Sequence, residues 1–170
     1  TSHLGGIAEI NDPSVGLTRQ AGPLIRFSRT PSSIGAPAPT MGEHDGEEGW
    51  TATEDRQSVV RKSTVAMPRH PLEGVLVLDF ATWLAAPIGT ALIAELGARV
   101  IKIEPTTGDE FRRTSPFART FQTKESLVVD LKTDEGREVV DKLVARADAV
   151  MHNMRGDAPK RIGIDYARVR

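Results

Sequence analysis

The stretch Val75-Leu76-Val77-Leu78-Asp79 decides the fold of the second half of this chain. Four successive apolar residues are typical of a parallel strand buried on both faces, and the aspartate closes the run. Pro87 follows where the first turn of a helix tolerates proline, and apolar residues at three- and four-residue spacing then predict a helix that Gly97 ends. The stretch Arg99-Val100-Ile101-Lys102-Ile103 predicts a second strand, so the pattern is β-α-β.

The same alternation continues toward the end of the sequence. Residues 127–130 predict a third strand, and Thr133 is a suitable cap for a following helix because two acidic residues come directly after it. Residues 149–151 predict a fourth, short strand, and a last helical turn is expected between Asp157 and Gly163. Strands and helices that alternate in this way predict an α/β fold with a parallel sheet.

The first part of the chain has a different composition. Residues 1–70 contain six prolines and eight glycines, which break any helical period. The polar stretch that follows the acidic residues 42–49 cannot offset an ordering cost of about 1–2 kcal/mol per backbone residue. We therefore expect an irregular Pro/Gly-rich segment over 1–45, a linker over 46–70 and a new folding unit over 71–170.

Composition narrows the class of protein further. The 170 residues are 39% apolar and 26% charged, and 22 basic against 23 acidic residues give a net charge of −1, which argues against a nucleic-acid partner. No apolar stretch reaches the roughly 18 residues of a membrane span, and no secretory leader is visible. The absence of cysteine fits a cytoplasmic location. Because the chain opens at Thr1, we interpret it as a processed or excised piece.

Several common kinds of site lack their motifs. Without cysteine, disulfide scaffolds, thiolate catalysis and Cys-ligated zinc are excluded, and no histidine has a partner four residues away, so no metal site is expected. The turn after the first strand lacks G-x-G-x-x-G, and Trp83 would obstruct a pyrophosphate there, so an NAD or FAD site is not expected. A phosphate-binding G-x-x-x-x-G-K-[ST] motif is also absent.

Two carboxylates and a basic cluster remain as candidates. Asp79 is interpreted either as a catalytic carboxylate at a strand end or as an acceptor for backbone N–H groups of the next turn. Glu104 is interpreted as a ribose-binding acid or as a solvated strand end. A surplus of positive charge after the fourth predicted strand suits a phosphorylated ligand, with Lys124 and Arg112 as possible additions. That surplus comprises Arg155, Lys160, Arg161, Arg168 and Arg170.

Seven stretches resemble, in the right order, the opening of family III CoA-transferases, which include formyl-CoA and carnitine-type acyl-CoA transferases. They are residues 71–79, 85–87, 96–105, 108–109, 130–137, 153–155 and 161–166. Residues 21–31, 36–39 and 42–44 are similar to the C-terminal tail of the same family. Because the tail precedes the head, we interpret residues 1–45 as the end of one unit and 71–170 as the start of a tandem second unit; a permuted arrangement is the alternative.

The resemblance implies a Rossmann-like parallel sheet that forms part of the family's large domain. In the family a smaller middle domain separates the two chain ends, and two subunits interlock as rings. The resemblance therefore implies a homodimer or a pseudo-dimer of tandem units in the parent protein, with the tail packed on the head.

The resemblance also implies that coenzyme A binds as a substrate, with no permanently bound cofactor. The implied site residues are Thr82, Trp83 and Ala85 near the thioester, and Lys124, Asn153, Met154 and Arg161 along the nucleotide. Arg161 and Lys124 are the expected phosphate partners, because guanidinium and ammonium groups neutralise phosphate oxygens. Met154 stands where the family commonly has phenylalanine, and its flexible apolar side chain can pack on adenine.

The family's nucleophile is an aspartate that attacks the acyl-CoA thioester, and it is expected beyond Arg170. None of Asp79, Asp109 or Asp130 matches its position. We therefore expect the parent protein to transfer CoA from an acyl-CoA to a carboxylic acid, and this chain alone to be inactive.

Two other functions remain open on the same residues. An α-methylacyl-CoA racemase shares the fold and the CoA site, and nothing in residues 71–170 separates it from a transferase. A non-catalytic CoA-binding or assembly module is the third interpretation, because Leu84, Pro105 and Asp157 depart from the family's pattern.

Overall fold

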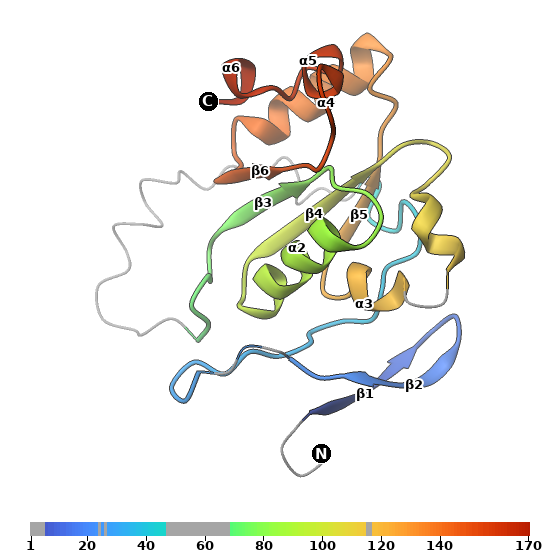
Figure 1. The fold of residues 1–170 in the computed structure, drawn as a ribbon, viewed down its shortest axis with the longest axis vertical. Helices are drawn as coiled ribbons and strands as arrows, with labels where there is room; N and C mark the ends of the chain where they lie inside the picture. Colours follow the sequence, from blue (N-terminus) through green and yellow to red (C-terminus); the bar gives the residue numbers. More distant parts are fainter. Residues whose placement is uncertain (1–5, 24, 26, 47–68, 115–116) are drawn as a thin grey trace.

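The computed structural model describes residues 6–23, 25, 27–46, 69–114 and 117–170 (Figure 1). Its main body is a four-stranded parallel sheet with helices on both faces, which confirms the expected α/β fold. The strands are β3 (Leu76–Asp79), β4 (Arg99–Glu104), β5 (Glu125–Val128) and β6 (Ala149–Met151). The helices are α2 (Ala85–Glu95), η3 (Glu110–Arg113, a 3₁₀ helix), α3 (Phe117–Phe121), α4 (Asp134–Val144), α5 (Ala158–Arg161) and α6 (Tyr166–Val169).

The strand order determines where a ligand can bind. The strands lie in the order β5-β4-β3-β6, so the first strand of the unit is flanked by the second on one side and the fourth on the other. Connections that leave the carboxyl ends of β3 and β6 therefore diverge. In open parallel sheets, ligands bind in the crevice at such a reversal of strand order.

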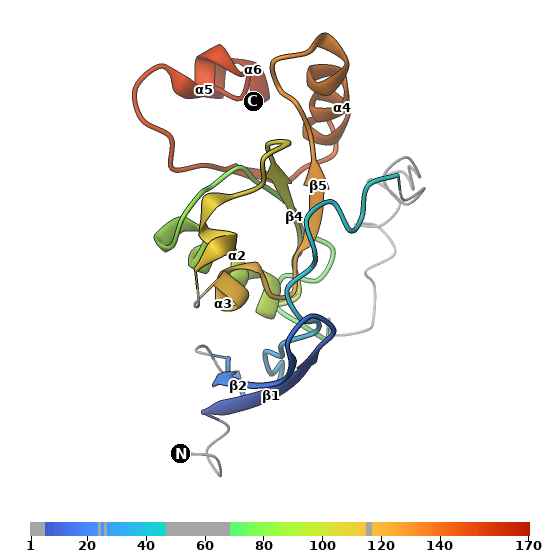
Figure 2. The ribbon, with the colours of Figure 1, turned by 90° about the vertical axis from the view of Figure 1, so that its right-hand side faces the viewer.

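Two apolar layers hold the helices on the sheet, and Figures 1 and 2 show how these helices are arranged around it. On one face α2 packs through Ala94 against Val77 and Val100. On the other face α4 packs through Val140 and Leu143 in a larger core, whose other buried members are Leu78, Phe80, Ile101, Ile103, Leu127, Val129 and Ile164. Among the described residues no helix is both long and apolar enough to cross a membrane.

Local signals set most helix ends as expected. The Thr133 hydroxyl accepts a hydrogen bond from the Gly136 amide at 3.1 Å and caps α4. Gly97 follows α2 with φ of +98°, a conformation that favours glycine. The third strand differs from the prediction: it runs over 125–128 and not 127–130. Its two polar residues are accommodated, because Arg99 pairs with Glu125 and Ser126 donates to Glu104.

The N-terminal segment is more regular than its composition predicts. β1 (Ile7–Asp12) and β2 (Gly16–Ala21) form an antiparallel hairpin, which lies apart from the parallel sheet in both views. The Asp12 carboxylate closes the turn by accepting from the Ser14 amide at 2.8 Å, and Gly16 has φ of +79°. The expected irregular segment over 1–45 therefore begins with a hairpin, whose Asp-Pro-Ser-Val-Gly turn is rich in residues that favour turns. The expected linker lies almost entirely outside the described residues.

Residues 35–45, which we call the arm, lie along the outer edge of β5. The His44 amide donates to the Ser126 carbonyl at 3.2 Å, and the Ser126 amide donates to His44 Nδ1 at 3.2 Å. The Val128 amide donates to the Asp45 carboxylate at 2.9 Å. Part of this edge is therefore satisfied by side chains that stand in for a neighbouring strand, which protects an otherwise exposed sheet edge.

Candidate functional site

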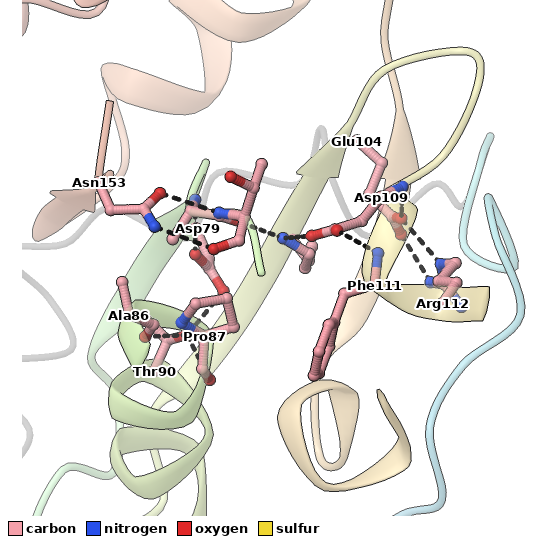
Figure 3. Close-up of polar contacts among 12 residues, drawn as sticks. Asp79, Ala86, Pro87, Thr90, Glu104, Asp109, Phe111, Arg112 and Asn153 are labelled. Atoms are coloured by element: carbon pink, nitrogen blue, oxygen red, sulfur yellow. Dashed lines mark hydrogen bonds and ion pairs between the residues drawn. The ribbon is translucent and has the colours of Figure 1, made fainter. Parts of the chain in front are cut away.

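The carboxyl ends of β3 and β6 are joined by one side chain. Asn153, which follows β6, accepts a hydrogen bond from the Thr82 amide at 3.0 Å and donates one to the Thr82 carbonyl at 2.9 Å. Figure 3 shows the Asn153 amide turned toward the end of β3. The Asn153 side chain thus binds both the amide and the carbonyl of Thr82, and so fixes the start of the β3–α2 turn (residues 81–84). This contact lies at the reversal of strand order described above.

Trp83 gives this turn an unusual backbone and an apolar surface. Its φ is +67°, a left-handed conformation that costs a non-glycine residue roughly 1–2 kcal/mol. Trp83 is 54% exposed and the neighbouring Leu84 is 46% exposed. The ring centroid of Trp83 lies 6.0 Å from that of Phe111. Residues held in such conformations are concentrated at binding and active sites. The turn therefore presents two large apolar side chains to solvent at the carboxyl edge of the sheet.

Asp79 supports the turn from below. The carboxylate is fully buried; Oδ1 accepts from the Ala81 amide at 2.9 Å, and Oδ2 accepts from the Thr90 hydroxyl at 2.6 Å (Figure 3). Of the two interpretations offered by the sequence, this geometry matches the acceptor for backbone N–H groups. Asp79 does not face solvent as a catalytic group in this structure.

Lys124 is buried against Asp79. Its ammonium donates to the Asp79 carboxylate at 2.8 Å, to the Thr90 hydroxyl at 2.7 Å and to the Pro87 carbonyl at 2.8 Å. Burial lowers the pKa of Lys124 to about 8, although the neighbouring Asp79 charge acts in the opposite direction. All three ammonium hydrogens are engaged, so here Lys124 holds the first turn of α2 and the end of β3 and does not point at a phosphate.

The contacts of Glu104 contradict both interpretations of this residue, as a ribose-binding acid and as a solvated strand end. It is neither solvated nor free for a ribose, because Arg112 binds both carboxylate oxygens at 2.8 and 2.6 Å and Ser126 donates at 2.7 Å (Figure 3). Burial favours the neutral form, but the hydrogen bonds from Arg112 and Ser126 and the Arg112 charge lower the pKa of Glu104. The carboxylate is a structural anion at the end of β4.

Lys102 and Asp109 belong to the same buried network, and neither was expected there. The Lys102 ammonium donates to the Ala81 carbonyl and forms an ion pair with Asp109 at 3.2 Å. The Asp109 amide in turn donates to Glu104 at 3.1 Å. The signal that could have found Lys102 is a lysine inside an apolar run that reads as a doubly buried strand. Such a lysine needs buried partners.

The remaining predicted residues have different surroundings. Ala85 is exposed at the first residue of α2. Met154 is half-buried and packs against the larger core beneath α4, so its side chain is only partly available to a ligand. Arg161 is exposed at the end of α5, and its side chain forms no hydrogen bond or ion pair with any described residue.

The predicted site residues therefore converge only in part. Thr82, Trp83, Ala85 and Asn153 form one surface, and Lys124 lies directly beneath it. No hydrogen bond or ion pair among the described residues joins Arg161 to them. The described residues also contain no cluster of three side chains able to hold a metal ion. What the surface can do chemically is bind an apolar group, through the exposed side chains of Trp83 and Leu84. The guanidinium of Arg161, which forms no hydrogen bond or ion pair with any described residue, lies apart on α5.

Comparisons with known proteins agree with this architecture. Residues 72–170 match the family described as CoA-transferase family III. The acetyl-CoA:oxalate CoA-transferase of Acetobacter aceti is 36% identical over a match covering 62% of this chain and 29% of that protein. The succinate–glutarate CoA-transferase of Agrobacterium fabrum is also 36% identical, with coverage of 60% and 30%.

A solved structure shows the same relationship. The CaiB/BaiF family protein of Brucella suis superimposes with a TM-score of 0.51 at 35% identity, over 59% of this chain and 30% of that one. The chain thus spans 29–30% of the length of these relatives.

Proposed function

Because the chain belongs to CoA-transferase family III, we propose that it supplies part of the CoA site of an enzyme that moves CoA from an acyl-CoA to a carboxylic acid. The observation that carries this proposal is the Asn153 clasp on Thr82, which orients the turn at the reversal of strand order. The two relatives described above are named as CoA-transferases acting with oxalate and with succinate and glutarate, which supports the reaction class.

The turn would hold the thioester end of CoA. Trp83 and Leu84 offer apolar surface to the pantetheine chain, and the first residue of α2, Ala85, allows close approach of the ligand because its side chain is small. Asn153 and Lys124 act on the ligand through the turn: one clasps Thr82, and the other fixes the end of β3.

The nucleotide end would lie toward α5. Arg161 has no partner among the described residues, so its guanidinium is available for a bidentate contact with a phosphate. Met154 lies between the turn and α5 in the sequence, where its half-buried side chain can pack on the adenine.

The proposed chemistry is covalent. An aspartate outside these 170 residues attacks the thioester carbonyl carbon; the carbon–sulfur bond breaks, CoA leaves as thiolate, and a mixed anhydride forms. The thiolate then attacks the aspartyl carbonyl, which releases the first carboxylate and leaves an aspartyl-CoA thioester. The acceptor carboxylate reverses these two steps and departs as the new acyl-CoA. The buried, paired carboxylates of Asp79, Glu104 and Asp109 have no part in these steps.

We also propose that residues 1–45 end one transferase unit and residues 71–170 begin the next, in a cytoplasmic protein that forms a dimer or a pseudo-dimer. The contact between the arm and β5 supports this interpretation, because a tail and a head of one domain type would pack in this way.

Titration calorimetry with CoA tests the binding proposal. We expect Arg161→Ala to weaken CoA binding by about 1–3 kcal/mol, the size of a lost charge-assisted contact. The matched control is Arg19→Ala, an exposed arginine on the hairpin, which lies at the other end of the molecule (Figure 1). Equal affinities for both variants and the native chain would contradict the assignment of Arg161.

A second measurement separates the reaction classes in the longer protein. With an acyl-CoA and an acceptor acid supplied together, appearance of the acceptor's CoA thioester supports the transferase. Exchange of the proton beside the thioester carbonyl with solvent deuterium, without transfer, would instead support the racemase. CoA binding with neither reaction would support a binding module.

A further inference from the structure

The backbone of Ala81 is held by two buried charges, one at its amide and one at its carbonyl. Its amide donates to the Asp79 carboxylate at 2.9 Å, and its carbonyl accepts from the Lys102 ammonium. Asp79 and Lys102 are 0% and 1% exposed. Ala81 immediately precedes Thr82 and Trp83. The two charges that hold the Ala81 backbone therefore also fix where the strained turn begins.

One polar route leads from the Ala81 carbonyl to the arm. Lys102 pairs with Asp109, whose amide donates to Glu104, and Glu104 is bound at both oxygens by Arg112 (Figure 3). A third hydrogen bond of Arg112 reaches the arm: Nη1 donates to the Pro39 carbonyl at 2.8 Å. A branch of the same route joins Glu104 to the arm through Ser126. Its hydroxyl donates to Glu104 and accepts from the Gly42 amide at 3.0 Å.

A second route leads from the Ala81 amide to the arm. Asp79 pairs with Lys124, and the residue before Lys124 is Thr123, whose φ is +61°. The arm holds this second left-handed residue: the Thr123 amide donates to the Ala36 carbonyl at 3.3 Å, and the Gly35 amide donates to the Thr123 hydroxyl at 3.3 Å. Both left-handed non-glycine residues among the described ones, Trp83 and Thr123, are therefore connected to the arm.

From these two routes we infer that arm residues 35–42 position the β3–α2 turn, and through it the ligand, although none of them is among the predicted ligand contacts. The ligand part of this inference rests on the proposed function. The physical reason is that release of the arm takes a hydrogen-bond partner from the Arg112 guanidinium and from the Ser126 hydroxyl, which both hold the buried Glu104 carboxylate. Leaving such groups unsatisfied is costly in a low-dielectric interior. The turn and the docked arm should therefore favour each other's native geometry.

A perturbation confined to the arm tests the coupling. A Cβ at Gly42 would come within 2.7 Å of Asp45 Oδ2, whose carboxylate accepts from the Val128 amide, and 3.3 Å of Val128 Cγ2, so Gly42→Ala crowds the contact between the arm and β5. Gly46→Ala is the matched control, because Gly46 has a similar positive φ of +78° but nothing within 4 Å of its Cβ position. Both variants incur backbone strain, and only the first crowds the contact between the arm and β5.

The readout is the fluorescence of Trp83. The chain has two tryptophans, so a Trp50→Phe background makes Trp83 the single indole. We expect Gly42→Ala to change Trp83 emission and acrylamide quenching, with a shift of roughly two- to thirtyfold in the equilibrium between held and released turn, as is usual for mutations along a coupled network. Gly46→Ala should leave both signals at their native values.

A matched pair of arginines tests the route itself. Arg112→Gln breaks the link from Glu104 to Pro39, whereas Arg99→Gln breaks a comparable two-bonded pair with Glu125 at the amino ends of β4 and β5. We expect Arg112→Gln to alter Trp83 fluorescence and to weaken CoA binding, and Arg99→Gln to do neither after correction for any loss of thermal stability.

The outcomes separate this inference from the proposed function. If Trp83 responds to Gly42→Ala and Arg112→Gln while the native chain shows no CoA binding, the coupling stands and the proposed function fails. If CoA binds but Trp83 fluorescence is the same in Gly42→Ala as in Gly46→Ala, the coupling is overturned. Should Arg112→Gln fail to fold, the Gly42→Ala comparison alone decides, since that change removes none of the buried charges.

Discussion

Trp83 occupies a backbone conformation that glycine would adopt without strain. The residue is more than half exposed, so little apolar burial offsets the strain within the described structure. A strained, exposed tryptophan at a strand end is consistent with a residue retained for what it contacts and not for stability.

This argument predicts an asymmetry between two neighbouring residues. Trp83→Gly should leave the free energy of unfolding unchanged or raise it by up to about 1 kcal/mol, because the strain of roughly 1–2 kcal/mol is relieved. Leu84→Gly, the control, has ordinary negative φ and should lower it by about 0.5–1 kcal/mol. Urea denaturation of both variants measures the difference. A larger loss for Trp83→Gly than for Leu84→Gly would show that the contact with Phe111 outweighs the strain.

At the scale of elements, two helical glycines have opposite surroundings. A Cβ on Gly136, in the first turn of α4, would lie 2.1 Å from the Asp130 carbonyl oxygen, which belongs to the backbone and cannot move aside. A Cβ on Gly89, in α2, would meet Met151 Cε at an ordinary 3.5 Å. The first glycine is therefore needed for the close approach of α4 to the end of β5, whereas the second is not.

Alanine at these two positions should change stability in opposite directions. Gly136→Ala should lower the free energy of unfolding by about 1–3 kcal/mol through overpacking at the cap. Gly89→Ala should raise it by about 0.5–1 kcal/mol, because alanine loses less backbone entropy in a helix. Thermal and urea unfolding followed by circular dichroism report both values. Equal effects at the two positions would mean that the Thr133 cap tolerates a shift of α4.

At the scale of the whole molecule, Lys124 couples stability to pH. Its ammonium titrates near pH 8 in the native state but near its ordinary value of 10.5 when unfolded. Below pH 8 both states hold the proton, and the full cost of burying the charge is present. Between these values the unfolded state binds more protons, so the free energy of unfolding gained from this group rises with pH, by up to about 1.4 kcal/mol per unit.

The test compares the native chain with the double variant Asp79→Asn/Lys124→Met, which removes both buried charges and leaves neither unpaired. We expect the native-minus-variant difference in free energy of unfolding to grow between about pH 8 and pH 10. Lys142→Met, which breaks an exposed pair with Glu138, should give a curve parallel to that of the native chain. Parallel curves for the double variant as well would contradict the lowered pKa of Lys124.

Local patterns predicted the elements whose signals are local. The apolar run before Asp79, the Thr133 cap and the strand at 149–151 were found because each depends on residues next to one another in sequence. The third strand begins two residues before the predicted start, since Glu125 and Ser126 are polar and are accommodated by partners on β4 and on the arm. Apolar and polar residues barely alternate along the two strands of the hairpin at 7–21, and its proline and glycine are also typical of irregular chain. The sequence pattern therefore does not predict the hairpin.

The sequence by itself determined the α/β class, the family resemblance and most of the residues around the β3–α2 turn, because hydrophobic period, caps and ordered motifs are properties of neighbouring residues. Only the tertiary structure decided that Lys124, Lys102 and Glu104 are buried and paired, and that the arm covers β5. A charge in an apolar run is stable only beside an opposite charge, and here that partner lies up to 45 residues away along the chain. Which charges meet is therefore set by strand order, and no local pattern contains it.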